Sequence, residues 1–564
     1  MYKKILFYSF IVAATVGFLT ACSSGLKPLA ADYVKAEPQP LELVGGKVPV
    51  TVNVTFPPKW FRKKATLVVT PVLRYDGGEV QGTPYTFQGE SALTNGQVIA
   101  LKEGGNATLK SSFDYVPAMK KSDLYLTLAE KKGKKEVLLP EIKIGEGVVA
   151  TADLLDAASE IPAIAPDKFK KIMTEAHNAD IMFLIEQAEL RPAELRKADL
   201  KEWQKLVAEA NKADNKTVSV EISAYASPDG GLELNEKLAG KREANTNKYL
   251  KSELKKSKVD VPLTTRYTAQ DWDGFKELVE KSNIEDKNLI LSALSQYTDP
   301  ERREQEIKNI SSVYTTLAQD ILPKLRRSKL TANVEIVGKS DEEILELVAS
   351  DPAALTLEEL LYSATLTATE AEKDRIYSKA TELFPNDYRA YNNMGVIAYV
   401  KRDISKAEAL FNKSLSIGVS PEANQNLGLV SIIKGDLEKA QQFFGKAAGV
   451  PELSNATGLI DIVQGNYPKA VSSFGKTASN NAALAHLLNK NYSAALSTLN
   501  AVAKPNAITA YLKAIVAART NNSNEVISGL KEAIRLNASL KTRAAEDLEF
   551  VKYFTNEEFI SVVK

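Results

Sequence analysis

A repeat of about thirty residues in the C-terminal part of the chain most constrains its fold. Glycines recur at intervals of 33 and 30 residues, and an alanine and a phenylalanine follow each of them at fixed distances. The recurring positions are Gly395, Gly428 and Gly458, then Ala407, Ala440 and Ala470, then Phe411, Phe444 and Phe474. Turn residues such as Asp403 and Asp436 separate each glycine from its alanine. The pattern predicts stacked helix pairs, in which glycine and alanine permit close helix contact and phenylalanine fills the space beneath the next unit.

Two of these units resemble a known repeat. Residues 403–411 and 436–444 resemble the second helix of the tetratricopeptide repeat, and residues 492–499 look like a degenerate copy. The resemblance covers residues 341–564 and implies an all-α, right-handed superhelix. It also implies a concave groove that binds peptide segments or protein partners. A generic helical bundle is the alternative.

The first residues predict an export signal. Lys3 and Lys4 precede an apolar run over residues 5–19, which is too short for a good transmembrane span. The run ends in Leu-Thr-Ala-Cys, which resembles the lipobox of bacterial lipoproteins. The resemblance implies a signal peptide over 1–21, cleavage before Cys22, and a lipidated tether over 22–39. A plain signal peptide with an incidental cysteine is the alternative.

By the same resemblance, the residue after the cysteine sets the location. Ser23 is not the aspartate that retains lipoproteins at the inner membrane, which implies an outer membrane anchor through a fatty acid such as palmitate. Residues 23–31 contain no acidic cluster like those of surface-export signals. We therefore expect the protein to face the periplasm.

The inventory of charged and metal-binding residues excludes several functions. The chain has 72 Lys and Arg against 71 Asp and Glu, so its net charge of +1 gives no field for nucleic acid. Its 564 residues include one cysteine and two histidines, His177 and His486. A disulfide framework, a zinc cluster and a cysteine nucleophile are excluded, and we expect no metal and no cofactor.

Residues 40–148 predict a β domain. Apolar residues alternate over 48–56 and again at Leu124, Leu126 and Leu128, as expected for half-buried strands. The length and the turn signals between the strands indicate an Ig-like sandwich. Trp60, Phe61 and Tyr85 are candidates for a glycan-binding platform, although such aromatics more often pack in a core.

The middle of the chain predicts an α+β domain. Strands are expected at 180–185, 218–225 and 330–337, and helices at 192–211 and 234–254. Residues 270–328 are expected to be mainly helical. This order implies a sheet covered by helices.

Residues 181–195, 220–230 and 235–250 resemble the OmpA-like peptidoglycan-associating domain, here spanning 165–338 with a helical insertion at 270–328. In that family an aspartate binds the ammonium of diaminopimelate, and an arginine fifteen residues later binds its carboxylate. Arg242 matches the arginine, and Asn235 matches a family asparagine. Ser227 stands at the aspartate position, so Asp229 is the nearby candidate for the ammonium. Ala332 and Asn333 stand where the family has two arginines.

These expectations combine into a non-enzymatic scaffold. A lipid would hold it in the membrane, the repeats would bind protein partners, and the middle domain would bind peptidoglycan. One alternative is a surface-exposed lipoprotein that captures glycans or other nutrients. An enzyme built on Ser223, Ser227, Asp229 and His177 is disfavoured, because the sequence has no nucleophile elbow, P-loop or dinucleotide fingerprint.

Overall fold

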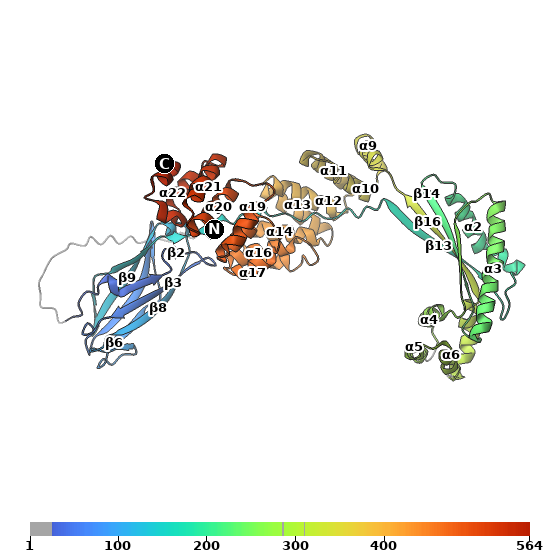
Figure 1. The fold of residues 1–564 in the computed structure, drawn as a ribbon, viewed down its shortest axis with the longest axis horizontal. Helices are drawn as coiled ribbons and strands as arrows, with labels where there is room; N and C mark the ends of the chain where they lie inside the picture. Colours follow the sequence, from blue (N-terminus) through green and yellow to red (C-terminus); the bar gives the residue numbers. More distant parts are fainter. Residues whose placement is uncertain (1–24, 285–286, 310) are drawn as a thin grey trace. The chain divides into compact units, whose positions relative to one another are not determined.

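The computed structural model describes residues 25–284, 287–309 and 311–564 (Figure 1). Its contacts divide the chain into two compact units, which are Met1–Pro166 with Phe384–Lys564, and Asp167–Leu383. The expected signal peptide and Cys22 lie outside the described residues. Within the described ranges, no helix combines the length and the apolar character needed to cross a bilayer.

The N-terminal part of the first unit is rich in β-strands, as predicted. One sheet has the order β1-β3-β8; a larger sheet has the order β10-β9-β4-β6-β7, with β11 beside β9 and β5 beside β4. Alternate residues of β3, from Val48 to Phe56, are buried in the core that the sheets share. The strands are β1 (Val34–Glu37), β2 (Leu41–Glu42), β3 (Lys47–Phe56), β4 (Thr66–Tyr75), β5 (Gly78–Gln81), β6 (Tyr85–Gly89), β7 (Gln97–Ile99), β8 (Gly105–Asp114), β9 (Ser122–Lys132), β10 (Lys135–Leu138), β11 (Ile142–Glu146) and β12 (Val148–Val149).

The tether expected over residues 22–39 is wrong in its described part. Leu26 and Leu29 are 4% and 5% exposed and belong to the core of the β region. β1 pairs antiparallel with β3, and the backbone N–H of Leu26 donates to the Glu130 carboxylate at 3.0 Å. The Pro- and Ala-rich composition indicated a flexible segment, but its leucines pack into the hydrophobic core of the β region.

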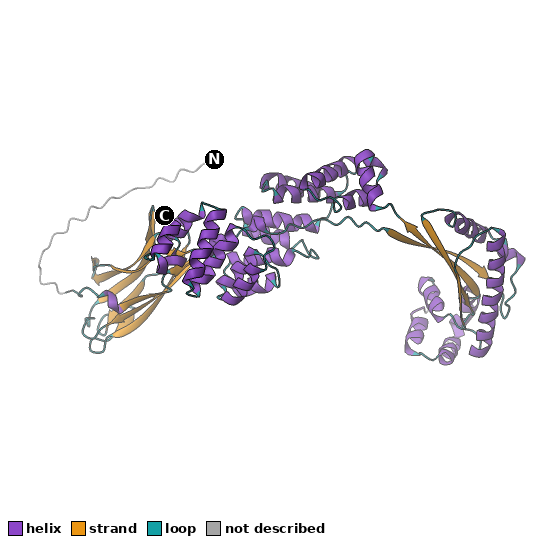
Figure 2. Ribbon diagram, turned by 45° about the horizontal axis from the view of Figure 1, so that its top comes forward, coloured by secondary structure: helices purple, strands orange, loops and turns teal. Residues whose placement is uncertain are grey.

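The C-terminal part of the first unit is entirely helical in secondary structure, apart from its turns (Figure 2). Successive helices form the predicted pairs, beginning with α12 and α13. The helices are α12 (Tyr388–Val400), α13 (Ile404–Ile417), α14 (Pro421–Ile433), α15 (Leu437–Phe444), α16 (Leu453–Val463), α17 (Tyr467–Phe474), α18 (Asn480–Leu488), α19 (Tyr492–Asn500), α20 (Ala507–Arg519), α21 (Ser523–Leu536), α22 (Leu540–Glu546) and α23 (Glu557–Val563).

The second unit contains a sheet with the order β13-β16-β14-β15. β14 and β15 are parallel, whereas β16 is antiparallel to both of its neighbours. Helices α2 and α3 pack on this sheet through side chains such as Trp203 and Leu250 (Figure 1). The elements are β13 (Ile172–Met182), α1 (Pro192–Leu195), α2 (Ala198–Ala210), β14 (Lys216–Tyr225), α3 (Leu232–Lys256), β15 (Leu263–Thr268) and β16 (Arg327–Val337).

Three details of this sheet differ from the prediction. β13 occupies residues 172–182 rather than 180–185, the helix expected over 192–211 is interrupted between α1 and α2, and β15 was not predicted. β15 is an edge strand whose residues are mostly exposed and polar, so it lacks the apolar alternation by which strands are recognised.

The described residues between Trp272 and Leu325 are mainly helical, as expected for the segment 270–328. Helices α4, α5 and η5 form a small core of their own around Phe275, Ile290 and Leu317. The helices are α4 (Trp272–Lys281), α5 (Lys287–Gln296), α6 (Pro300–Asn309), α7 (Ser311–Thr316), the π-helical turn η5 (Leu317–Ile321) and α8 (Leu322–Leu325). Helices α9 (Asp341–Ser350), α10 (Leu357–Ser363) and α11 (Glu370–Leu383) also belong to the second unit, although the sequence placed them in the repeat domain.

Candidate functional site

The repeated glycines lie against the repeated phenylalanines. A Cβ atom built on Gly395 would lie 2.5 Å from the ring of Phe411, and one on Gly458 would lie 2.8 Å from the ring of Phe474. Gly428 and Phe444 form the same contact. Each phenylalanine thus packs in its own unit, on the helix that precedes it, and glycine is required because any side chain would overlap the ring.

The turns within the units are also built alike. A residue with a positive φ stands two positions after the end of each first helix, with φ of +64° at Arg402, +79° at Gly435 and +77° at Gly465. The next residue immediately precedes the second helix. In the first two units this residue is an aspartate, Asp403 or Asp436, whose carboxylate accepts a backbone N–H of the first turn. Ala407, Ala440 and Ala470 are fully buried in the second helices.

The first helices bury asparagines in a common register. Asn393 and Asn426 stand two residues before Gly395 and Gly428, and Asn481 stands two residues before Ala483, the corresponding small residue of α18. Asn393 and Asn481 are 2% exposed, and Asn426 is fully buried. Buried amides require hydrogen-bond partners, and here the partners come from a distant part of the sequence.

Residues 154–166, which we call the docked segment, supply those partners. Asn426 accepts the N–H of Ala163 at 2.7 Å and donates to its carbonyl at 2.8 Å. Asn393 bonds both backbone groups of Ala165, at 2.8 and 3.0 Å. Asn481 does the same to Asp156, at 3.1 and 3.0 Å. The first helices therefore form a groove that holds a segment of the same chain by its backbone. The segment contains the 3-10 turn η4 (Ala157–Ser159), and residues 161–166 after it contain no helical turn.

Further contacts support the docked segment along its length. The Tyr399 hydroxyl donates to the carbonyl of Ala157 at 2.6 Å, and Asn392 donates to that of Ala163 at 3.0 Å. Arg402 binds the Asp156 carboxylate with two nitrogens, at 3.0 and 2.7 Å. Such two-point pairing fixes orientation as well as distance.

One acidic side chain of the docked segment is buried in the groove. Glu160 is 4% exposed and accepts the amide of Asn481 at 3.2 Å. Burial raises the pKa of this carboxyl, and the amide contacts of Asn481 and Asn455 offset only part of that effect.

The second candidate site lies in the second unit, after β14. Arg242, on α3, is fully buried and donates to the carbonyl oxygens of Gln187 at 2.9 Å, Tyr225 at 2.8 Å and Leu184 at 3.1 Å. Burial and the charge of Arg326 lower the pKa of Arg242 to about 10, so its guanidinium stays charged at neutral pH. Its donors therefore hold the loop after β13 and the end of β14 to helix α3 in this structure.

The other predicted residues of this site do come together. Asp229 accepts a hydrogen bond from Ser227 and one from Arg326 at 3.0 Å, and Arg326 also donates to the Ser227 hydroxyl at 3.2 Å. Asn235 donates to the carbonyls of Ser227 and Gly230 at 2.9 and 2.8 Å, which fixes the loop. Arg326, which immediately precedes β16, therefore supplies the guanidinium that pairs with Asp229.

The residues considered for catalysis do not form a catalytic group. His177 pairs with Ala332 on β16, whereas Ser227 contacts Arg326 beyond the start of that strand. Six residues of strand separate those two points, or roughly 20 Å. The nearest acceptor for the His177 ring is Glu175, at 3.2 Å.

The aromatics considered for glycan binding pack in the β region. Phe61 is fully buried, and the Trp60 ring stacks on that of Phe56 with centroids 5.5 Å apart. The Tyr85 hydroxyl bonds the backbone of Lys110. These residues therefore pack at the edge of the hydrophobic core and do not form an exposed surface on which a sugar ring could stack.

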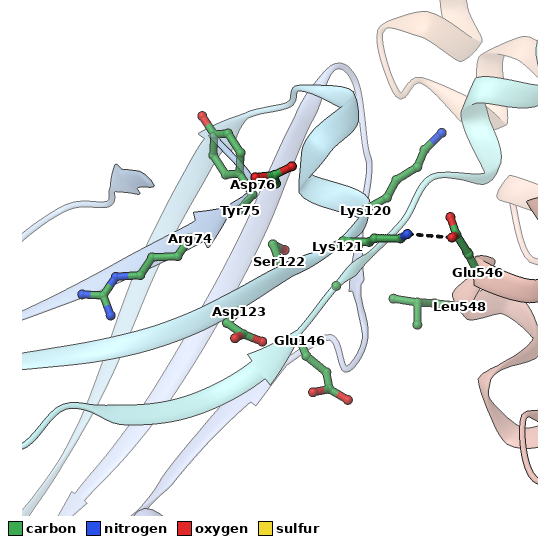
Figure 3. Close-up of a pocket in the computed structure, with 11 residues that line it drawn as sticks. Arg74, Tyr75, Asp76, Lys120, Lys121, Ser122, Asp123, Glu146, Glu546 and Leu548 are labelled. Carbon is green, nitrogen blue, oxygen red and sulfur yellow. Dashed lines mark hydrogen bonds and ion pairs between the residues drawn. The ribbon is translucent and has the colours of Figure 1, made fainter. Parts of the chain in front are cut away.

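A cavity of about 530 Å³ lies beside β9 and β11, and Figure 3 shows its charged lining. Lys121 pairs with Glu546 at 2.6 Å, and Lys120 pairs with Asp153 at 2.8 Å. Asp123 and Glu146 share Lys143. Because these charges already have partners within the protein, the lining gives no sign of a missing ligand.

Sequence reasoning missed the asparagines and the docked segment. The spacing of 33 residues between Asn393 and Asn426, equal to that of the adjacent glycines, is the signal that could have found them. A polar residue at the same position of successive apolar helices indicates a shared buried partner.

Comparison with known proteins identifies the repeat. A tetratricopeptide repeat family model matches residues 421–451, which are α14, α15 and the turn after them. The C-terminal part is thus a tetratricopeptide-repeat region, as predicted. None of the curated proteins matches the chain.

Several solved structures are similar to parts of the chain. A tetratricopeptide repeat protein from Parabacteroides merdae is 15% identical, with 40% of this chain and 89% of that chain covered and a TM-score of 0.27. PilF of Pseudomonas aeruginosa is 15% identical over 38% and 98%, with a TM-score of 0.27. YrrB, described as having an unusual peptide-binding site, is 18% identical over 35% and 94%, with a TM-score of 0.21.

Proposed function

We propose that this protein is a non-enzymatic scaffold of the bacterial cell envelope that binds protein through its helical repeats. The observation that carries the proposal is the groove in which Asn393, Asn426 and Asn481 hold a protein segment by its backbone. Tetratricopeptide repeats are protein-binding modules, and backbone hydrogen bonds are a common way of holding an extended segment.

Photo-cross-linking in intact cells tests this role. A photoreactive residue is placed at Val419, an apolar residue that is 85% exposed in the turn between α13 and α14. The control position is Leu93, which is fully exposed in the β region. We expect one envelope protein to be trapped at Val419 and not at Leu93. Trapping at neither position, or the same set of proteins at both, would contradict a partner at the repeats.

We further propose that a lipid on Cys22 anchors the protein in the outer membrane, facing the periplasm. The support is the sequence alone, because Cys22 lies before the described residues. Metabolic labelling with palmitate should mark the wild type and not Cys22→Ser. The wild type should also sediment with outer membranes and resist protease added to intact cells. An unlabelled wild type would refute the anchor, and digestion from outside would refute the periplasmic orientation.

Peptidoglycan binding by an OmpA-like domain remains a proposal for the second unit. It is supported by the sheet order and by the gathering of Ser227, Asp229 and Arg326 at the end of β14. Because Arg242 is occupied by three carbonyls, we assign the contacts with the zwitterion to Asp229 and Arg326, whose ion pair would have to open.

A pull-down on purified cell walls distinguishes this role from a structural one. We expect Asp229→Asn to reduce binding and Glu233→Gln, which removes an exposed carboxylate at the start of α3, to leave it unchanged. Circular dichroism on both variants controls for folding. Equal binding by the two folded variants would limit this loop to a structural role.

A further inference from the structure

Three asparagines of the groove recognise backbone, beside the side-chain contacts that it makes with Asp156 and Glu160. A carboxamide presents a donor and an acceptor together, and Asn393, Asn426 and Asn481 each use both on the N–H and the C=O of one residue. An adjacent β-strand would offer the docked segment the same pair of contacts. At Ala163 and Ala165 the groove therefore holds chain in an extended conformation, whereas its contact with Asp156 lies beside the 3-10 turn η4 (Ala157–Ser159).

Side-chain size supplies the selectivity. Ala163 and Ala165 are 0% and 1% exposed, so their methyl groups face the repeats without room for a larger group. By contrast, Ile161 and Ile164 are 62% and 57% exposed and point away from the contact. The groove thus selects small residues two positions apart and tolerates large ones beside them.

We propose that the groove is a binding site for extended segments with small side chains at two positions two residues apart, and that residues 154–166 of the same chain keep it closed. The inference deepens the proposed protein-binding role of the repeats. A partner that enters the groove must carry the same pattern and displace the docked segment.

Peptide binding to an opened groove tests the inference. The probe is a fluorescent peptide with the sequence of residues 154–166, added to the full chain in detergent. The variant Ala163→Asp with Ala165→Asp places two carboxylates where only methyl groups fit, which should release the docked segment. We expect the peptide to bind this variant at least tenfold more tightly than the wild type, as measured by fluorescence anisotropy.

Matched controls show whether peptide binding results from release of the docked segment. Ile161→Asp with Ile164→Asp introduces the same two charges at exposed positions and should stay closed like the wild type. A peptide that carries the two Ala→Asp changes should not bind the opened variant. Equal binding to wild type and variant would show that the groove is not closed, and absence of binding to the folded variant would refute the peptide site.

Hydrogen exchange on the wild type covers the case in which the double variant does not fold. The amides of Ala163 and Ala165 should exchange slowly, and Asn426→Ala and Asn393→Ala should remove the protection of Ala163 and Ala165 respectively. Rapid exchange in the wild type would overturn the proposal, as would a dimer that forms by exchange of the segment between copies. Neither experiment involves the partner trapped at Val419, so failure here is distinct from failure of the scaffold role.

Discussion

Replacing Gly458 by alanine tests the packing rule of the repeats. The added Cβ would lie 2.8 Å from Cε2 of Phe474 and 3.1 Å from its Cδ2 and Cζ, so the ring has to move. Phe474 is 2% exposed within the core of the repeats and has little room to do so. Overpacking of this kind costs about 1–3 kcal/mol. Alanine recovers up to about 1 kcal/mol through its better helix propensity.

We therefore expect Gly458→Ala to lower the stability of α16 by about 1–2 kcal/mol. Its unit has Ala456 at the asparagine position, so α16 lacks the two-point backbone contact that Asn393, Asn426 and Asn481 make, although its Asn455 still contacts Glu160. Hydrogen exchange of the α16 amides in the full chain reads this directly, because 1–2 kcal/mol corresponds to roughly 5- to 30-fold faster exchange through local opening.

The matched control is Gly445→Ala at the end of α15. Its Cβ would meet the nearest atoms, two backbone oxygens, at 3.5 Å, which is ordinary contact, and its φ of −60° suits alanine. We expect no loss of stability there. Adding Phe474→Leu to Gly458→Ala should cost less than the sum of the two single changes, because the smaller side chain relieves the overlap. A Gly458→Ala protein as stable as the wild type would refute the reasoning.

Three further outcomes follow from buried polar groups. Arg242→Ala should destabilise the second unit by at least about 3 kcal/mol, because three buried carbonyls lose their donor. Fluorescence of the buried Trp203 during urea unfolding measures this loss of stability. An unchanged unfolding midpoint would contradict the prediction. Burial raises the pKa of Glu160 above its value in the undocked segment, so docking of the segment should be strongest in acid and weaken as the pH rises through the docked pKa. Hydrogen exchange of the Ala163 amide between pH 4 and 7 measures this change in docking. Glu160→Gln should remove the pH dependence. The amide of Gln425 is buried without a hydrogen-bond partner among the described residues, so Gln425→Leu should stabilise α14 by about 1 kcal/mol; a clear loss in thermal unfolding would mean that the amide has a partner.

The helix pairs could be predicted because their determinants are local and recur. The contact between Gly458 and Phe474 spans sixteen residues, and the same interval returns in neighbouring units. The Leu-rich alternation that predicted β9 is likewise contained within one strand.

The docked segment could not be predicted, because its determinants are distant. Ala163 meets Asn426 across 263 positions of sequence, and an Ala- and Pro-rich stretch has the composition of a flexible linker. Arg242 was predicted from a motif to bind the carboxylate of peptidoglycan, but its partners in this structure are carbonyls of residues up to 58 positions away. A motif can identify such a residue without revealing that its donors are already used.

The hydrogen bonds between Ala165 and Asn393 also suggest how the chain could be shortened. The second unit is an insertion whose entry follows Pro166 and whose exit precedes Phe384, and the 2.8 Å bond between Ala165 and Asn393 joins chain close to both points. Because the chain before the insertion is hydrogen-bonded to the chain after it, the insertion can be removed without having to bring distant ends together. Joining residues 166 and 384 through a few glycines should yield a shorter protein whose β region and repeats remain folded.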